Sequence, residues 1–266
     1  MTYKLSDDSY TWLSENFSMK NDRSATERLF AAQDALALPD FTEMLSGNFT
    51  YKKVTTGEEE AELAIYRSKL QQLKSKYPDT YGWISIDGTN IDYPIMQGEN
   101  EYYLHHDFSG NSSSAGAIYI DSSCRKKLTE NPAAVIYGHN IRTRGIMFNQ
   151  LLRYMDKSFF DAHPYITVYT PDGVYTYTIF SFFQTTADSG YIRMDFASEE
   201  DFAAHFTTLR SNSWYQRAGM GETIFTADSR VLVLSTCTNG AENERYAVIA
   251  LLTDKLESTK EEAPAT

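Results

Sequence analysis

The chain has 266 residues, 24 of them basic and 36 acidic, which gives a formal net charge of −12. This charge argues against a nucleic-acid partner, because phosphate binding requires a basic surface. Two cysteines are too few for a disulfide framework, although a single bridge between Cys124 and Cys237 stays open. The sequence contains neither an apolar run long enough to span a membrane nor a signal-peptide pattern at its start. The protein is therefore expected to be cytoplasmic, or else to follow an anchor encoded upstream of about Tyr3.

The first part of the chain predicts a polar extension followed by one helix. Short apolar clusters within residues 1–60 indicate brief helices without a common periodicity. A longer helix is predicted over residues 57–77, because apolar residues from Leu63 to Leu73 recur at spacings of three and four. Pro78 then ends this helix.

The rest of the chain alternates short strands with a few helical stretches. Strands are predicted at residues 83–86, 91–95, 117–120, 133–137, 165–169, 174–183, 231–235 and 246–252. Helices are predicted from Phe148 to about Phe160 and from about Ser198 to Tyr215, the second one beginning with a capping pattern. Many short strands with few helices predict a mostly β fold, a closed β-barrel of about eight strands.

Three segments follow from this pattern. Residues 1–60 form an N-terminal extension, partly helical or flexible, and residues 61–254 form the main domain. The acidic segment 255–266 is expected to be a disordered tail.

Two strand ends carry residues suited to nucleophilic chemistry. Cys237 directly follows an apolar strand, so its thiol would be held rigidly and still be reachable at the rim of a sheet. The alternative is a small buried hydrophobic residue, as many free cysteines are. His139 follows Gly138 at the end of another strand, where it could serve as general acid and base. The alternative is a loop histidine without a role.

Arg245 begins the strand that follows the cysteine loop. Its guanidinium could donate several hydrogen bonds to an oxyanion, and its charge persists at any working pH. The alternative is an ordinary salt bridge to Glu242 or Glu244. Together with Cys237 and His139, it places one member of a His, Cys and Arg set at each of three strand ends. Papain-like proteases have their cysteine before their histidine, and this chain has the reverse order.

Several segments together resemble one enzyme family. YGWISIDGTNIDYPIMQ, YYLHHDFSG, GAIYID, VIYGHN, MFNQLLRY, LVLSTCT and RYAVIA resemble sortases, and class B sortases in particular, in the family's order. The similarity covers about Tyr77 to Thr253. The segment between Gln184 and Thr223 looks like the helix-bearing insertion that is typical of class B, and it lies before the cysteine strand.

The resemblance implies a sortase-type barrel and a cysteine transpeptidase. Cys237 would cleave the C-terminal sorting motif of a surface protein and form a thioacyl intermediate, with His139 moving protons and Arg245 binding the carbonyl oxygen. An amine of the peptidoglycan cross-bridge would accept the acyl group. Alternatives are a pilus-type enzyme that joins pilins through a lysine, and a non-catalytic binding module. The resemblance also implies the outer face of a Gram-positive cell membrane, an N-terminal anchor and no cofactor.

Further residues near these motifs are weaker candidates. Ser235, Thr236 and Asn140 are candidate substrate-binding residues because they flank the cysteine and the histidine. Thr238 stands where some class B relatives carry an acidic residue, so no carboxylate is expected there to orient the histidine.

Two other motifs are expected to have no catalytic part. The pair His105 and His106 is not expected to bind a metal, because adjacent residues on a strand point to opposite faces. Cys124 is expected to pack structurally. We therefore predict no metal site.

Overall fold

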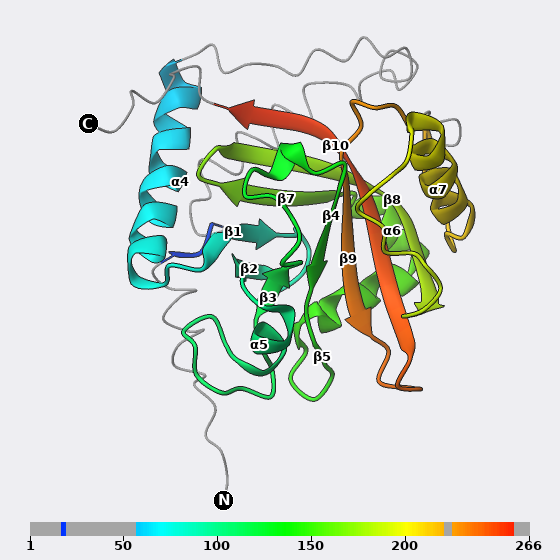
Figure 1. Ribbon diagram of the computed structural model, residues 1–266, viewed down its shortest axis with the longest axis horizontal. Helices are drawn as coiled ribbons and strands as arrows, with labels where there is room; N and C mark the ends of the chain where they lie inside the picture. Colours follow the sequence, from blue (N-terminus) through cyan, green and yellow to red (C-terminus); the bar gives the residue numbers. More distant parts are fainter. Residues whose placement is uncertain (1–16, 20–56, 221–224, 258–266) are drawn as a thin grey trace, which may run out of the picture.

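The computed structural model describes residues 17–19, 57–220 and 225–257 (Figure 1). Eight strands close into a barrel in the order β1-β2-β3-β4-β9-β10-β8-β7, which confirms the predicted fold class. The barrel strands are β1 (Thr80–Ser85), β2 (Asp92–Met96), β3 (Ile118–Ile120), β4 (Ala133–Tyr137), β7 (Tyr165–Thr170), β8 (Gly173–Thr186), β9 (Val231–Cys237) and β10 (Glu244–Glu257). Two pairs are parallel, β2 with β3 and β4 with β9, and the other six are antiparallel.

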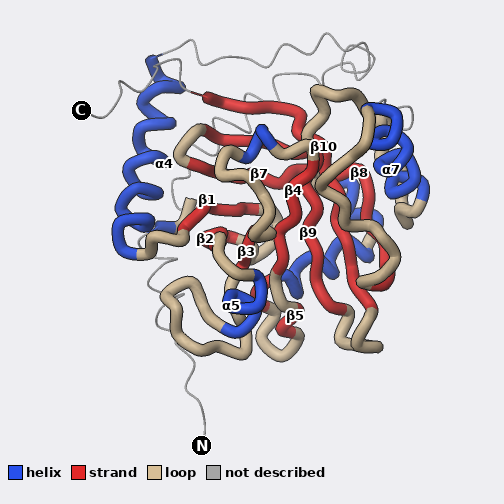
Figure 2. Tube along the Cα trace, in the orientation of Figure 1, coloured by secondary structure: helices blue, strands red, loops and turns tan. Residues whose placement is uncertain are grey.

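Helices and one small hairpin surround the barrel. They are α4 (Gly57–Lys76), α5 (Asn100–His105), η1 (Leu128–Glu130), β5 (Asn140–Ile141), β6 (Ile146–Met147), η2 (Phe148–Met155), α6 (Lys157–Ala162) and α7 (Glu199–Ser211). Figure 2 shows α4 and α7 on opposite sides of the barrel, with α5 and β5 near the end where β9 passes into β10. The predicted helix in the insertion before β9 is α7, and Ser198 caps it by accepting a hydrogen bond from the backbone of Asp201.

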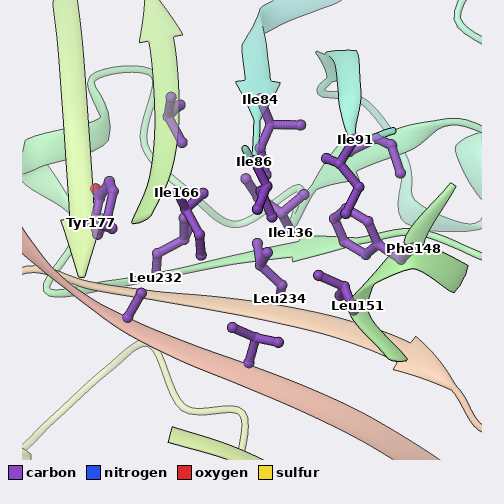
Figure 3. Packing of buried hydrophobic residues seen from close by; sticks show 14 of the residues in the cluster. Ile84, Ile86, Ile91, Ile136, Phe148, Leu151, Ile166, Tyr177, Leu232 and Leu234 are labelled. Atoms are coloured by element: carbon purple, nitrogen blue, oxygen red, sulfur yellow. The ribbon is translucent and has the colours of Figure 1, made fainter. Parts of the chain in front are cut away.

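The strands form where apolar residues can be buried on both faces. In β4, Ala134 and Ile136 face the barrel interior, and Ala133 and Val135 face an outer cluster. The same division applies to β9, which explains its continuous apolar run, because a strand covered on both sides needs no polar face. Isoleucine, leucine and aromatic side chains from opposite strands meet inside the barrel (Figure 3).

Two outer clusters fix the helices to the barrel. On one side α4 buries Leu63, Leu70 and Leu73 against Trp83 of β1. Met19, from the N-terminal extension, is 1% exposed in the same cluster. On the other side α7 packs its phenylalanines into a cluster with outward-facing residues of β8, β4, β9 and β10. Part of the predicted extension therefore belongs to the folded unit.

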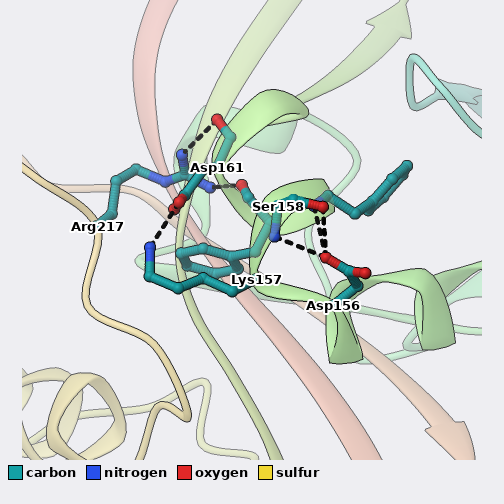
Figure 4. A network of polar contacts seen from close by, with 7 residues as sticks. Asp156, Lys157, Ser158, Asp161 and Arg217 are labelled. Atoms are coloured by element: carbon teal, nitrogen blue, oxygen red, sulfur yellow. Dashed lines mark hydrogen bonds and ion pairs between the residues drawn. The ribbon is translucent and has the colours of Figure 1, made fainter.

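The segment η2–α6 covers one end of the barrel and is fastened by an arginine. Arg217 donates hydrogen bonds to the carbonyl oxygens of Ile179, Phe160 and Asp161, and its guanidinium lies 4.3 Å from the Phe160 ring centroid. Lys157 forms an ion pair of 2.5 Å with the Asp161 carboxylate in the same network (Figure 4).

The structure differs from the sequence-based expectations at two places. The strand geometry assumed for His105 and His106 in the argument against a metal is wrong: His105 is the last residue of α5, and His106 forms an isolated bridge with Ser112. The aromatic composition of this segment favours a strand, but the local packing imposes a six-residue helix. β10 continues to Glu257, three residues into the predicted tail, because its last residues pair with β8. The brief helices expected near residues 29–38 lie outside the described residues.

Candidate active site

Cys237 and Arg245 are direct partners on neighbouring antiparallel strands. Cys237 ends β9, and the register of β9 with β10 places Arg245 opposite it. Side chains of directly opposed residues point to the same face of a sheet. By strand alternation from Val233, this is the outer face of the barrel. The loop between the strands therefore brings the thiol and the guanidinium to one place.

His139 reaches the same place through the parallel pair β4 and β9. Tyr137, the last residue of β4, lies opposite Ser235, and the backbone of Gly138 donates to the Ser235 carbonyl oxygen at 3.3 Å. Continuing this register puts His139 beside Cys237. A Cβ atom on Gly138 would lie 2.4 Å from the terminal methyl of Ile118 and 2.8 Å from the ring of the fully buried Phe148, so the packing favours glycine here. The three predicted catalytic residues thus lie at the ends of three adjacent barrel strands.

The imidazole of His139 is oriented by the end of α5. Its Nε2 lies 2.8 Å from the carbonyl oxygen of Leu104. A carbonyl oxygen can only accept, so Nε2 carries a proton, and Nδ1 is the nitrogen that remains for proton transfer. Gly116, with φ of +57°, permits this contact, since a Cβ atom there would lie 2.7 Å from the Leu104 oxygen and 3.0 Å from the imidazole.

Arg245 is anchored by backbone oxygens rather than by carboxylates. Its Nη1 donates to the carbonyl oxygens of Glu242 at 2.8 Å and Glu244 at 2.9 Å. The carboxylate of Glu244 instead accepts from the Thr238 hydroxyl at 3.0 Å, which braces the loop between β9 and β10. The two hydrogens of Nη1 are engaged in this way, and the N–H groups of Nε and Nη2 remain for a substrate oxygen.

Of the other three candidates, Ser235 and Asn140 have hydrogen-bond partners within the protein, whereas the buried hydroxyl of Thr236 has none among the residues that the structure describes. The hydroxyl of Ser235 shares a hydrogen bond of 2.6 Å with the Tyr191 hydroxyl. Thr236 is 2% exposed, and strand alternation turns its side chain to the barrel interior, away from Cys237. The amide nitrogen of Asn140 donates to the carbonyl oxygen of Cys237 at 2.8 Å. A direct role of these side chains in substrate binding stays a prediction.

Two tyrosines near the site were not predicted from the sequence. Burial raises the pKa of Tyr119 to about 12, and the charge of Asp121 adds to this, followed by that of Cys237. Burial also raises the pKa of Tyr191, whereas its hydrogen bond to Ser235 lowers it. Both hydroxyls therefore stay neutral near pH 7 and can donate or accept hydrogen bonds. Tyr119 lies in the GAIYID segment and Tyr191 in no quoted motif, but neither sequence position indicates closeness to Cys237, which arises from strands and a loop distant in sequence.

The remaining residues singled out in the sequence, Cys124 and His105, contact other side chains of the protein. Cys124 and Cys237 are both free, and burial raises the pKa of Cys124 to about 11. Its sulfur lies 3.7 Å from that of Met194. His105 pairs with Glu101 at 3.2 Å. Within the described ranges no group of three or more His, Cys, Asp and Glu residues could hold a metal ion. None of the helices in those ranges is long and apolar enough to cross a bilayer.

Comparison with known proteins assigns the family. The sortase domain model matches residues 84–253. Sortase B of Listeria monocytogenes is 34% identical over 69% of this chain and 72% of its own length. Sortase B of Staphylococcus aureus is 30% identical over 76% of this chain and 89% of its own length. Among solved structures, Clostridium perfringens sortase B has a TM-score of 0.64 at 35% identity, covering 69% of this chain and 99% of that one.

The barrel places Cys237, His139 and Arg245 at adjacent strand ends. The sortase domain model matches most of the residues that form this barrel. The chain belongs to the sortase family of cysteine transpeptidases. Its curated relatives and structural neighbours are sortases B, so within the family it is a class B sortase.

Proposed function

We propose that the protein cleaves the sorting motif of surface proteins and transfers the acyl part to an amine of the peptidoglycan cross-bridge. The observation that carries this proposal is the pairing of Cys237 with Arg245 beside the histidine-bearing end of β4. A Staphylococcus aureus sortase B structure, with a TM-score of 0.65 at 28% identity, is a substrate complex. The match covers 74% of this chain and 92% of the Staphylococcus aureus chain. This similarity supports a peptide substrate for this protein as well.

In the first step Cys237 passes its thiol proton to Nδ1 of His139, and its sulfur attacks the scissile carbonyl carbon. A C–S bond forms, the C–N bond breaks, and the protonated imidazole of His139 gives its Nδ1 proton to the leaving amine. Nδ1 is suited to this role because Nε2 is held by the Leu104 carbonyl oxygen. The product is a thioacyl enzyme and a released C-terminal fragment.

In the second step the acceptor amine attacks the thioacyl carbon. His139 removes the proton of the amine, a new amide bond forms, and the C–S bond breaks to restore Cys237. In both steps negative charge develops on the carbonyl oxygen. The N–H groups of Arg245 that the loop carbonyls leave open would stabilise this charge, an effect worth about 10²–10³ in rate for a single donor elsewhere.

The insertion before β9 lies beside the strand end of Cys237, which supports a contact with the bound peptide. Tyr191 lies in this insertion and joins the Ser235 hydroxyl, two residues before Cys237. The backbone of Ala187 also donates to the Asn243 carbonyl oxygen at 2.8 Å, which ties the insertion to the loop between Cys237 and Arg245. We propose that this insertion recognises the sorting motif. Following its family, the protein is expected to work at the cell surface.

A ligation assay tests the function. Peptides of the NPxTx, SPxTG and LPxTG types are offered with oligoglycine, diaminopimelate or lysine-bearing acceptors, and products are read by mass spectrometry. We expect a ligated product with the wild type and with Cys124→Ala, and none with Cys237→Ala. Arg245→Lys keeps the charge but loses the planar fork, so its rate should fall about 10²-fold.

The acceptor preference separates the possible roles. Preference for a cross-bridge amine supports a role in wall anchoring. Exclusive use of a pilin-type lysine would instead indicate a role in pilus assembly. Absence of both cleavage and thioacyl adduct with every motif would contradict the catalytic proposal and favour a non-catalytic binding module.

A further inference from the structure

The backbone hydrogen bonds between β4 and β9 end before His139 and Cys237. Beyond that point, asparagine side chains connect the two segments. The final backbone contact is that of Gly138 with the Ser235 carbonyl oxygen. Beyond it, Asn140 Nδ2 donates to the Cys237 carbonyl oxygen at 2.8 Å. In return, Asn239 Nδ2 donates to the Asn140 carbonyl oxygen at 2.8 Å. The residue after the histidine is therefore bonded both to the cysteine and to the loop that follows it.

A third asparagine fixes the orientation of this contact. Asn149 Nδ2 donates to Asn140 Oδ1 at 2.7 Å. Because Oδ1 is held as an acceptor, the amide nitrogen of Asn140 must face the Cys237 carbonyl oxygen, and the side chain cannot flip without losing both contacts. Asn140 is only 5% exposed, so its amide has little access to water as an alternative partner.

We propose that Asn140 is a positioning residue, which holds the strand end of His139 at a fixed distance from that of Cys237. This proposal rests on the proposed function, in which Cys237 attacks the substrate carbonyl and His139 transfers protons to and from the leaving and accepting amines. Proton transfer and nucleophilic attack both depend steeply on distance, and a displacement of about 1 Å can cost about 10²-fold in rate. Asn140 acts through the backbone of Cys237 and need not touch the peptide.

The surroundings of the network support a rigid clamp. On its other side the His139 carbonyl oxygen accepts from the backbone of Phe148 at 2.9 Å, so the histidine segment is held between η2 and β9. Asn239 has φ of +62°, a conformation that asparagine tolerates better than most residues. Its backbone conformation and its side-chain bond thus both favour asparagine at this position.

Steady-state kinetics of four variants test the clamp. We expect Asn140→Ala to lower kcat about 10- to 100-fold while KM for the sorting peptide stays within about twofold. Asn149→Ala leaves the hydrogen bond from Asn140 to Cys237 in place but no longer fixes the orientation of the Asn140 amide. The loss of kcat in this variant should therefore be smaller. The double variant should match Asn140→Ala, since the two residues act as one unit. Asn239→Gly preserves the positive φ while removing the side chain, and a loss intermediate between wild type and Asn140→Ala is expected.

A second measurement needs no substrate. The rate at which iodoacetamide alkylates Cys237 is followed against pH by peptide mass spectrometry, with the buried Cys124 as internal reference. We expect the profile of Asn140→Ala to move from that of the wild type toward that of His139→Ala. If the wild type ligates no peptide, the proposed function fails, whereas the alkylation profile still tests the clamp on its own.

Three outcomes would overturn the proposal. One is a raised KM with unchanged kcat in Asn140→Ala, which would make Asn140 a substrate contact. Another is an additive loss in the double variant. The third is an alkylation profile of Asn140→Ala identical to that of the wild type. Should Asn140→Ala fail to fold, the half-buried Asn149 provides the same test, because Asn149→Ala must then shift kcat and the profile together.

Discussion

At the scale of single residues, the site depends on glycines that allow close approach. Gly116 lies where the carbonyl oxygens of Tyr103 and Leu104 and the ring of His139 converge, so that a Cβ atom at this position would meet them at 2.7 to 3.0 Å. Its φ of +57° adds a second reason for glycine. The orientation of the imidazole is therefore encoded partly in a residue that carries no chemistry.

We predict that Gly116→Ala lowers the ligation rate by about 10²-fold, because the new methyl group displaces the Leu104 oxygen or the imidazole. Gly145→Ala is the matched control: its φ of +64° imposes a similar backbone penalty, but its nearest neighbour would be 3.4 Å away. Ligation rates and thermal unfolding of both variants provide the measurement. Equal losses of activity in the two would show that the close approach at Gly116 does not matter.

The catalytic candidates could be predicted at this scale and their partners could not. Cys237, His139 and Arg245 each stand at the end of an apolar strand, and a strand end is visible in sequence. The Leu104 carbonyl oxygen is a backbone atom, so no residue type marks its contact with His139. Tyr191 meets Ser235 only because the insertion folds back over β9.

At the scale of elements, the cover formed by η2 and α6 depends on one half-buried cation, Arg217. Burial lowers the pKa of Arg217, and three backbone carbonyl oxygens accept its hydrogen bonds. Those oxygens belong to β8 and to α6, so the arginine links a strand of the barrel to the helix over its end.

Replacing Arg217 by Met keeps the apolar stem but leaves these oxygens without a donor. We predict a loss of about 2–4 kcal/mol in the free energy of unfolding, measured by urea denaturation. Lys157→Met is the control from the same network: its ion pair with Asp161 is solvent-exposed, and its loss should cost less than about 1 kcal/mol. A cost for Arg217→Met no larger than that of the control would contradict the assignment.

Elements with strong periodicity or long apolar runs were predictable, and short ones were not. β4 matches its predicted range, and α4 begins where expected and ends one residue earlier, because propensity, pattern and packing agree there. α5 has only six residues and no side-chain cap at Glu99, so local sequence gives it little support. Its contacts with the barrel, made through Tyr103, decide its conformation.

At the scale of the whole molecule, the folded unit extends beyond the matched sortase domain. Phe17 packs against the outer cluster of α4 and β1, and Met19 is buried in it, although residues 20–56 separate them from α4 in sequence. A barrel of about eight strands could be predicted from strand number alone. Its strand order and the packing of residues 17–19 could not, since both depend on contacts between distant segments.

We predict that Met19→Ala lowers the free energy of unfolding by about 2–5 kcal/mol, as expected for a large-to-small change in a closed cluster. Ile65→Ala, on the exposed face of α4, removes a side chain that is 46% exposed and should cost less than about 1 kcal/mol. Urea denaturation compares the two variants. Similar small costs would mean that the N-terminal segment adds nothing to the stability of the barrel.

The parallel pairing of β4 with β9 also has a consequence for how the enzyme is made. These strands lie far apart in the chain, so the entropy of closing a long loop must be overcome before they can pair. Non-local pairings of this kind slow folding. Of the barrel strands, β9 and β10 are also the last to leave the ribosome. A nascent chain therefore holds His139 without a nucleophile beside it, and we expect the thiol to gain its catalytic neighbours only when translation of the barrel is complete.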